Sequence, residues 1–259
     1  MINLKTLRLE KNDNVLTVWL NREDKANAIN LEMLKELITL ADWLREQSEI
    51  KFVVFTNGGK TFSAGFDLNQ FSEFMEKDQK SPQHSRLVQI SGQEMMRKIE
   101  NIEQVTISAI RGSAYGGGVC LIMATDFRLM TDNSVLNLPE TNVGIFLGWG
   151  GTSRLVNAVG AVKAKEMIMM CEDVTAEECH KLGLINKVVS SENIDCEVKQ
   201  IIEKIHSKGQ LSIRLAKKTV NSSIAHNVGD ILVSEPELFE RVTISNETQQ
   251  LINSFKQNS

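Results

Sequence analysis

Four short runs rich in β-branched and aromatic residues recur in the first half of the chain, and they constrain the fold more than any other feature. They cover residues 14–20, 52–56, 105–110 and 126–130. Several of these runs are apolar at nearly every position, which is typical of strands buried on both faces of a parallel sheet. Longer segments with helical periodicity lie between them, at residues 30–46 and 82–101. We therefore expect an α/β protein whose sheet is covered by helices.

The pattern changes after about residue 151. One strand-like run remains at residues 184–190, and helical patterns cover residues 161–170, 175–183, 194–206, 210–227 and 230–255. Asn30 is expected to cap the first helix of the chain, whereas Thr175 should cap, and Gly183 should end, a helix of the second half. No linker rich in Pro, Gly or Ser separates the two halves. The prediction is an α/β core that carries a helical C-terminal part.

Composition narrows the classes of function. The 259 residues, 42% hydrophobic and 24% charged, fit one large globular domain or a domain with an appendage. A formal net charge of −4 gives no overall basic excess, so nucleic acid is a poor candidate partner. A charged residue, Lys5, lies within the first five positions, and no apolar run there is long enough for a secretory signal. No segment reaches a membrane-spanning length. We expect a soluble, cytoplasmic protein that does not bind membranes.

The chain has four cysteines, Cys120, Cys171, Cys179 and Cys196. Their spacing contains neither a C-x-x-C pair nor a metal-ligand pattern. We expect reduced cysteines that serve mainly as small core residues, without disulfides and without bound zinc.

Two glycine-rich loops each follow a predicted strand and precede an apolar helical segment. One is 111-RGSAYGGG-118, and the other is 57-NGGKTFSAGFDLNQF-71, which should turn into a helix through residues 64–67. Backbone N–H groups at helix starts are unpaired, and the lack of a Cβ atom lets a ligand approach them. Neither loop has the spacing of a phosphate-binding motif. Each loop alone could be a tight turn, but two converging loops could supply the two donors of an oxyanion hole.

Five segments carry a further pattern. They are 21-NREDKANAIN-30, 53-VVFTNGGKTFSAGFDL-68, 111-RGSAYGGGVCLIMATDFRL-129, 138-LPETNVGIFLGWGGTSRL-155 and 175-TAEECHKLGLINKVV-189. In their order and spacing they resemble the crotonase family, the enoyl-CoA hydratase/isomerase superfamily. The end of the chain, 251-LINSFK-256, also fits, so the resemblance covers nearly the whole sequence.

This resemblance implies a spiral of β-β-α turns over residues 1–195. It also implies a C-terminal helical region over residues 196–259 that forms trimers and closes the coenzyme A site. The assembly would be a homotrimer or a dimer of trimers. The implied substrates are acyl-CoA thioesters, with coenzyme A present only as part of the substrate and with no other cofactor or metal. An acyl-phosphopantetheine arm on a carrier protein would fit such a site equally well.

The resemblance also assigns roles to residues by position. The backbone N–H groups of Phe66 and Gly117 would form the oxyanion hole for the thioester carbonyl. Other positions match substrate-contacting segments of the family: Lys25, Ala26, Ala28, Ala64, Asp67, Leu68, Tyr115, Cys120, Trp149, Phe255 and Lys256. Lys25 could equally be a solvated surface lysine. Trp149 is larger than the residue often found at its position, so it would narrow the acyl site or belong to the core.

Hydratases of this family hold water between two glutamates, one shortly after the glycines and one in a later Pro-Glu. Here Cys120 occupies the first position and Glu140 the second. A thiol is a poor hydrogen-bonding group, so hydration by two carboxylates should be impaired. Moving a double bond from C3 to C2 needs only one base, which takes a proton from C2 and returns it at C4. We therefore predict isomerisation of 3-enoyl-CoA to 2-enoyl-CoA, with Glu140 as the acid/base residue.

Other readings stay open. The same enolate could serve a hydratase, dehydratase or decarboxylase acting on a CoA-linked or carrier-linked acyl group. The fold could also serve a non-catalytic binding protein, for instance an RNA-associated one, although Glu140 and the acidic net charge argue against this. Cys120 as a nucleophile would need a nearby base, and His84, His180, His206 and His226 all lie far from it in sequence. The segment 69–87, which contains His84, should enclose the acyl group.

Overall fold

The protein is described here by a computed structural model of residues 1–259. Its backbone is described except at residues 1, 72, 74–82, 226–228 and 258–259. Side chains are additionally left out at residues 224–234, 255 and 256.

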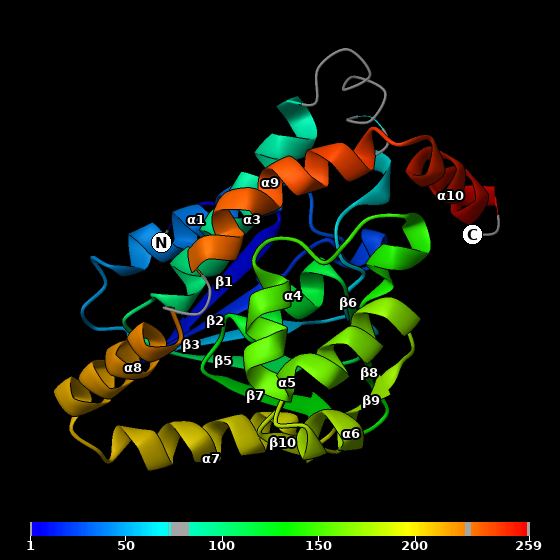
Figure 1. Cartoon of the computed structure of the whole chain (residues 1–259). Coiled ribbons are helices and arrows are strands. Elements are labelled where there is room, and N and C mark those ends of the chain that lie inside the picture. The colour runs from blue at the N-terminus through cyan, green and yellow to red at the C-terminus, as the bar shows by residue number, and fades with distance from the viewer. Residues whose placement is uncertain (1, 72, 74–82, 226–228, 258–259) are drawn as a thin grey trace.

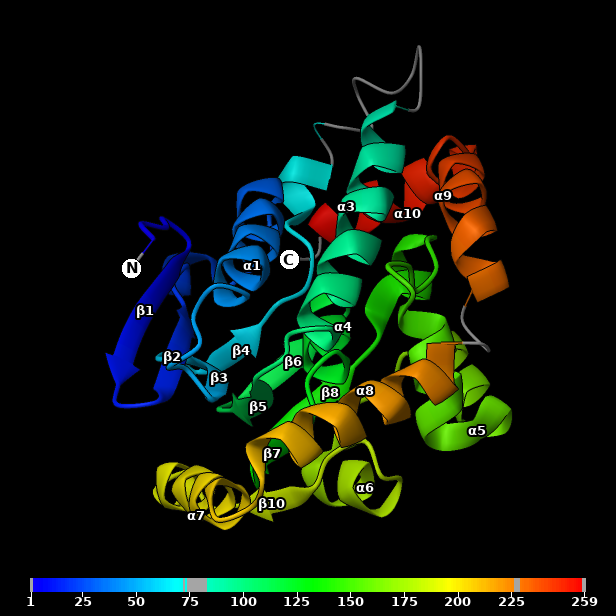
Figure 2. The ribbon, with the colours of Figure 1, turned by 90° about the vertical axis from the view of Figure 1, so that its left-hand side faces the viewer.

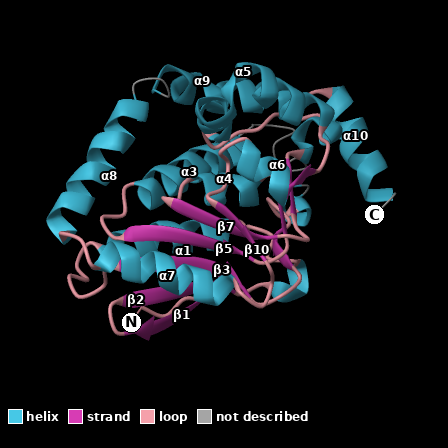
Figure 3. Ribbon diagram, turned by 90° about the horizontal axis from the view of Figure 1, so that it is seen from below, coloured by secondary structure: helices cyan, strands magenta, loops and turns pink. Residues whose placement is uncertain are grey.

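A six-stranded sheet forms the centre of the molecule (Figure 3). Its strand order is β1 (Leu7–Asn12), β2 (Val15–Leu20), β3 (Phe52–Asn57), β5 (Val105–Ile110), β7 (Phe127–Thr131) and β10 (Lys187–Val189). β1 pairs with β2 antiparallel, and the other neighbours are parallel. Every residue of β3 and β5 is buried, as expected for strands with helices on both faces.

Alternate residues of β3 belong to two different cores, because successive side chains of a strand point to opposite faces. Val53 and Phe55 join the larger core, which packs against α1 (Leu31–Leu44), α3 (Gln83–Glu100) and α4 (Gly117–Met123). Phe52 and Val54 join a smaller core that packs against α7 (Ile194–His206). Both faces of the sheet are therefore apolar.

A second sheet has four short strands, β4 (Thr61–Ser63), β6 (Ser113–Tyr115), β8 (Val135–Asn137) and β9 (Val174–Thr175). Strands β3, β5 and β7 are each followed by one of these short strands and then by helix. Residues 68–71 are helical after β4 and α3 comes next, while α4 follows β6. After β8 come the 3-10 helix η2 (Pro139–Val143) and α5 (Gly151–Met170). This repetition is the β-β-α order that the family resemblance implied.

Two predicted helix caps are confirmed. The Asn30 side chain accepts a hydrogen bond of 2.9 Å from the Met33 N–H at the start of α1. Thr175 and Glu178 form a capping box at the start of α6 (Ala176–Lys181). Gly183 follows α6 with a φ of +76°, a left-handed conformation that favours glycine beyond a helix end.

Three predicted helix boundaries are wrong. Residues 64–67 form a loop, and helix begins only at residue 68. The helix predicted at 161–170 is the second part of α5, which begins at Gly151 and is interrupted at Gly160. The single helix predicted at 230–255 is two helices, α9 (Gly229–Thr243) and α10 (Asn246–Gln257). A new helix begins after Ser245, because the Ser245 Oγ caps it by accepting the Thr248 N–H at 3.2 Å.

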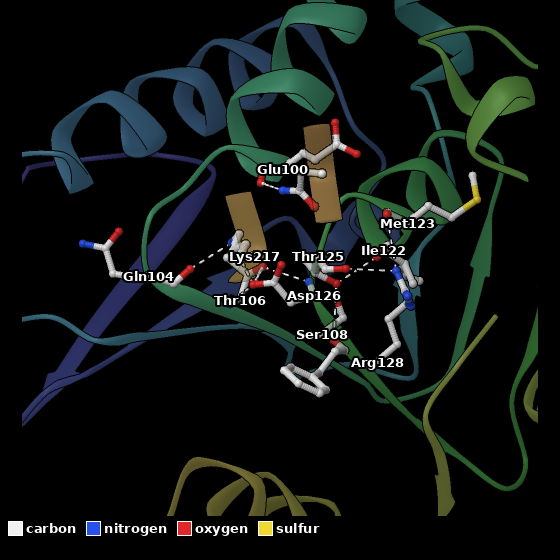
Figure 4. A network of polar contacts seen from close by, with 12 residues as sticks. Glu100, Gln104, Thr106, Ser108, Ile122, Met123, Thr125, Asp126, Arg128 and Lys217 are labelled. Atoms are coloured by element: carbon white, nitrogen blue, oxygen red, sulfur yellow. Dashed lines mark hydrogen bonds and ion pairs between the residues drawn. The ribbon is translucent and has the colours of Figure 1, made fainter. Parts of the chain in front are cut away.

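Helix α8 (Gln210–Ala225) is attached to the core by a partly buried polar network (Figure 4). The Lys217 ammonium donates to the Asp126 carboxylate at 2.7 Å and to the Gln104 carbonyl at 2.9 Å. The same Asp126 oxygen also accepts the Thr106 N–H at 2.8 Å. Lys217 therefore connects α8 to the segment that follows α3 and to the start of β7.

Helix α9 follows α8 in the chain and packs against α3. Helix α3 lies between α1 and α9 (Figure 2). Polar contacts join α9 to α3, since Arg86 pairs with Glu237 at 2.8 Å and Gln93 donates to Glu235 at 2.6 Å. Phe239 of α9 and Ile252 of α10 pack with Phe71. The two C-terminal helices thus cover the segments that follow β4 and β8 (Figure 1).

None of the helices in the described part of the chain is long and apolar enough to cross a membrane. Within that same part, no three His, Cys, Asp or Glu side chains are grouped so that they could hold a metal ion.

Candidate active site

The two glycine-rich loops lie side by side. Gly65 has a φ of +87°, and a Cβ atom built on it would lie 3.0 Å from the Tyr115 carbonyl oxygen and 3.5 Å from the Gly117 nitrogen. The loop at residues 57–71 is held by two backbone hydrogen bonds to Ile29. The Ile29 N–H donates to the Gly65 carbonyl at 2.7 Å, and the Ile29 carbonyl accepts the Asp67 N–H at 2.9 Å. Glycine at position 65 therefore allows the close approach of the two loops.

Each of these loops carries one of the two predicted donors, the backbone N–H groups of Phe66 and Gly117. The bridge to Ile29 uses the residues on either side of Phe66, so the N–H of Phe66 points away from it. Gly117 is the first residue of α4, where an N–H has no partner within the helix. Neither N–H donates to an acceptor in the described part of the chain. Both residues line one cavity, so the two predicted donors border the same space.

The cavity has a volume of about 470 Å³. Its walls come from the two loops, η2, residues 145–149, α3 and α9. Eight predicted site residues line it: Ala64, Phe66, Leu68, Tyr115, Gly117, Cys120, Glu140 and Trp149. Phe71, Phe146 and Phe239 complete a largely aromatic wall. An apolar cavity with few polar groups is the usual form of a small-molecule site.

The other predicted residues lie elsewhere. Lys25 is exposed on the 3-10 helix η1 (Glu23–Lys25), and Ala26 and Ala28 follow it, outside the described cavity lining. Their loop is nevertheless attached to the site, because Ala64 donates to the Ala26 carbonyl at 2.9 Å. The Asp67 carboxylate pairs with Arg22 at 2.9 Å, which connects the loop at residues 57–71 to the segment at residues 21–30.

Two predictions concern segments that are described only in part. Phe255 and Lys256 belong to α10, and their side chains lie outside the described part of the structure. Much of the segment 69–87 is likewise outside it, but Phe71 of this segment lines the cavity. His84 lies on α3 and is not among the residues described as lining the cavity.

Glu140 is placed by η2, which begins with Pro139, a residue favoured in the first turn of a helix. Its carboxylate lies against the glycine loop, since a Cβ atom on Gly116 would be 2.5 Å from Oε1. Oε2 is buried, and no group in the described part of the chain donates to it. Burial raises the pKa of Glu140 to about 7. This carboxyl can therefore both take up and release a proton near neutral pH.

Cys120 lies one helical turn into α4 and is 1% exposed. Its Sγ is 3.9 Å from the Gly148 carbonyl oxygen and would be 2.7 Å from a Cβ atom on Gly151. Burial, followed by the charges of Glu140 and Glu235, raises the pKa of the thiol well above its usual value. No histidine is found in the described lining of the cavity. A protonated, enclosed thiol that lines the cavity fits the expectation of a cavity wall better than that of a nucleophile.

Sequence reasoning missed several groups of the site. Asn137, Gln89 and Phe239 also line the cavity, and Glu235 lies directly behind it. Glu235 and Phe239 are four residues apart, so they share one face of α9. Helical spacing could have paired these two residues, but it could not have indicated the cavity that they approach.

The architecture defines a class of protein: a spiral of β-β-α turns, with a cavity where the glycine loops meet η2. A family model for enoyl-CoA hydratase/isomerase matches residues 10–258. The chain therefore belongs to the enoyl-CoA hydratase/isomerase family, the crotonase family expected from its sequence.

Individual relatives agree with this assignment. A protein named crotonyl-CoA hydratase from Syntrophomonas wolfei is 34% identical, over 89% of this chain and 87% of its own length. A short-chain-enoyl-CoA hydratase from Clostridium acetobutylicum is 32% identical, over 92% of this chain and 89% of its own. The crystal structure of an enoyl-CoA hydratase from Bacillus anthracis is 30% identical and has a TM-score of 0.79, covering 98% of this chain and 97% of that one.

Proposed function

We propose that this protein isomerises 3-enoyl thioesters of coenzyme A to 2-enoyl thioesters, with Glu140 as its only acid/base residue. One observation carries the proposal. A buried carboxyl with a pKa of about 7 borders the same cavity as two free N–H groups, while a thiol occupies the place of a second carboxyl. The cavity thus offers one proton carrier and one oxyanion hole.

The proton in this reaction moves only between the substrate and the Glu140 side chain. The Glu140 carboxylate removes a proton from C2, and the electron pair left behind forms a dienolate. The N–H groups of Phe66 and Gly117 stabilise the negative charge on the thioester oxygen. The Glu140 carboxylic acid then returns the proton at C4, and the double bond is left between C2 and C3. A pKa near the working pH suits both halves of this cycle.

Hydration of 2-enoyl-CoA is the second candidate, because two relatives at 34% and 32% identity are named as hydratases. Cys120 argues against it, since a thiol hardly positions a water molecule. Dehydration or decarboxylation through the same enolate, on coenzyme A or on a carrier-protein arm, would use the same donors.

The coenzyme A part of the substrate is proposed to lie along the loops that contain Lys25, Ala26, Ala28 and Leu68. The hydrogen bond between the Ala64 N–H and Ala26 supports this, because it keeps the two loops adjacent. Phe255 and Lys256 of a neighbouring subunit are proposed to complete the site. We infer a homotrimer or a dimer of trimers located in the cytoplasm. Apolar side chains left exposed on α5 and α8 support the assembly, among them Met169, Leu211 and Leu215.

The test follows the absorbance of the conjugated thioester when the protein is mixed with a 3-enoyl-CoA. A parallel assay follows loss of this absorbance from a 2-enoyl-CoA through hydration. We expect conjugation to form with little hydration. Glu140→Gln should slow isomerisation by roughly a hundredfold or more. Glu177→Gln, at an exposed position on α6, is the control and should not change the rate. Hydration faster than isomerisation in the natural protein would overturn the proposal in favour of a hydratase.

The variant Cys120→Glu tests whether the absence of a second carboxyl limits hydration. Cys120→Gln is its matched control, because it adds similar bulk without an acidic group. We expect hydration to rise in Cys120→Glu only. A folded Cys120→Glu protein without any gain would mean that the missing acid does not limit hydration.

A further inference from the structure

The indole of Trp149 occupies a slot formed by two glycines on different helices. A Cβ atom on Gly92 of α3 would overlap the Cγ and Cδ1 atoms of the indole. A Cβ atom on Gly117 of α4 would lie 2.5 Å from its Cζ3 atom. Trp149 is 4% exposed, so the slot is filled. Any side chain at either glycine would displace the ring.

The backbone at Trp149 needs support because it is left-handed. Its φ is +59°, a conformation that bulky residues rarely adopt and that costs on the order of 1 kcal/mol. Gly150 follows with a φ of +71°. Such a conformation persists only where surrounding contacts determine it.

Three helices provide those contacts. Gln89 of α3 accepts the Trp149 N–H at 3.2 Å. Glu235 of α9 accepts the Gly150 N–H at 2.8 Å, and Arg154 of α5 donates to the Gly150 carbonyl at 3.1 Å. Glu235 is 2% exposed and is itself held by Gln93 of α3 at 2.6 Å. The turn at residues 149–150 is therefore held by side chains of α3, α5 and α9.

This fixed indole stands beside the oxyanion hole. Its ring meets the Phe66 ring edge to face, with the centroids 5.8 Å apart and an interplanar angle of 86°. Its other neighbour is Gly117, the second donor residue. An acyl group whose carbonyl is bound there starts its path next to Trp149, inside a cavity of about 470 Å³.

We propose that Trp149 is the specificity-determining residue that restricts this enzyme to short acyl chains, in a slot provided by Gly92 and in a position maintained by Gln89 and Glu235. Trp149 and Gln89 border the substrate cavity, whereas Glu235 acts through the turn and is a positioning residue. The inference rests on the proposed function only in placing the thioester carbonyl at Phe66 and Gly117.

Binding of saturated acyl-CoA tests the inference without any reaction. Isothermal titration with butanoyl-, hexanoyl- and decanoyl-CoA should show that the natural protein binds butanoyl- or hexanoyl-CoA at least about tenfold more tightly than decanoyl-CoA. Trp149→Ala should lose this preference, gaining roughly threefold to fourfold in affinity for each further methylene that the opened cavity buries. If Trp149→Ala does not fold, Trp149→Phe provides a smaller ring for the same series. Equal affinity for short and long chains in the natural protein would refute the inference, as would an unchanged preference in the folded variant.

A double-mutant cycle tests the slot. Gly92→Ala should weaken butanoyl-CoA binding in the natural background, because the new methyl displaces the indole. In the Trp149→Ala background the same substitution should have almost no effect. Equal effects in the two backgrounds would mean that Gly92 does not accommodate the ring.

Glu235→Ala tests the support of the turn, with Glu237→Ala as its matched control. Both residues lie on α9, but Glu237 forms an exposed pair with Arg86. Glu235→Ala should reduce the preference for short chains, whereas Glu237→Ala should keep it. A less stable Glu235→Ala protein with an unchanged preference would show a purely structural role.

These measurements separate the inference from the proposed function. A protein that prefers short acyl-CoA but isomerises nothing would leave the inference intact and overturn the proposed reaction. A protein that isomerises 3-enoyl-CoA but binds all chain lengths equally would support the proposed reaction and overturn the inference about Trp149.

Discussion

At the scale of single residues, the burial of Glu140 lowers the free energy of unfolding at neutral pH. Burial disfavours the charged carboxylate and raises the pKa of Glu140 from 4.5 to about 7, while a backbone hydrogen bond at Glu140 opposes the shift. Between these two values the folded chain holds a proton that the unfolded chain has released. The free energy of unfolding therefore falls as the pH rises through this range. The property that suits Glu140 to proton transfer also opposes folding at neutral and higher pH.

Glu140→Gln should remove this pH dependence. In the natural protein the group lowers the free energy of unfolding by roughly 3 kcal/mol between about pH 5 and about pH 8. In Glu140→Gln the free energy of unfolding, measured in urea at both pH values, should fall by that much less than in the natural protein. Glu177→Gln serves as the exposed control and should follow the natural protein. Parallel pH curves for Glu140→Gln and the natural protein would contradict the assigned burial effect.

The cysteines should differ in reactivity as their burial differs. Cys120, Cys171 and Cys179 are buried, and Cys196 is exposed. A thiol reagent such as dithionitrobenzoate should therefore modify one thiol quickly in the folded protein and all four after denaturation. Cys196→Ser should lose the fast reaction. Peptide mapping that found rapid modification of Cys120 in the folded chain would revive a reactive role for that thiol.

At the scale of elements, a charge pair helps to attach α8 to the rest of the molecule. Lys217 is 10% exposed and Asp126 is 19% exposed at their side chains. Burial lowers the pKa of Lys217, and Asp126 opposes that shift by favouring the ammonium form. Each charge thus needs the other, so the pair functions as a unit.

Asp126→Asn should leave the Lys217 ammonium buried without its counter-charge. We expect a loss of about 3 kcal/mol in the free energy of unfolding, measured in urea. The double variant Asp126→Asn, Lys217→Met should recover part of that loss. Lys218→Met, at an exposed neighbouring position, is the control and should be nearly neutral. A double variant less stable than Asp126→Asn alone would argue against a coupled pair.

The sequence revealed most long elements of the fold because their burial leaves a local pattern, but it missed β1, a six-residue strand that is mostly exposed. The strands β3 and β5 were predicted from their apolar runs, which exist because both sheet faces are covered. The short strands β4, β6 and β8 were missed because three residues show no periodicity, and their pairing depends on partners far along the chain. The break between α9 and α10 had a local signal in Ser245, a helix-capping residue, that was not used.

The same distinction applies to the candidate site. The glycine loops, Glu140 and Cys120 could be located because each lies in a recognisable local pattern. Gln89 and Glu235 could not, because they act on a turn from helices far away in sequence. Trp149 was singled out by its size, but the glycine that accommodates it lies on α3 and gave no signal.

At the scale of the whole molecule, the exposed apolar side chains of α5 and α8 suggest a surface that another subunit covers. Leu211 and Leu215 lie one helical turn apart on α8, and they are 69% and 55% exposed. Side chains of this kind in a row favour association.

Light scattering coupled to size exclusion should give a mass of about 87 kDa, three times the 29.0 kDa chain, or twice that value for a dimer of trimers. Leu211→Glu combined with Leu215→Glu should reduce this mass, because charges would be placed in the contact. Lys204→Glu on the exposed side of α7 is the control. A natural protein that elutes as a monomer at high concentration would exclude the proposed trimer.

The position of α9 after the glycine loops and Glu140 in the chain affects the order in which the parts of the site are synthesised. Both glycine loops and Glu140 leave the ribosome well before Glu235 and Phe239, the residues that support and cover their cavity. A nascent chain that has not yet reached α9 therefore lacks both Phe239, which lines the cavity, and Glu235, which accepts the Gly150 N–H. Premature termination near residue 225 would leave the cavity uncovered, and such a product should be prone to aggregation and degradation.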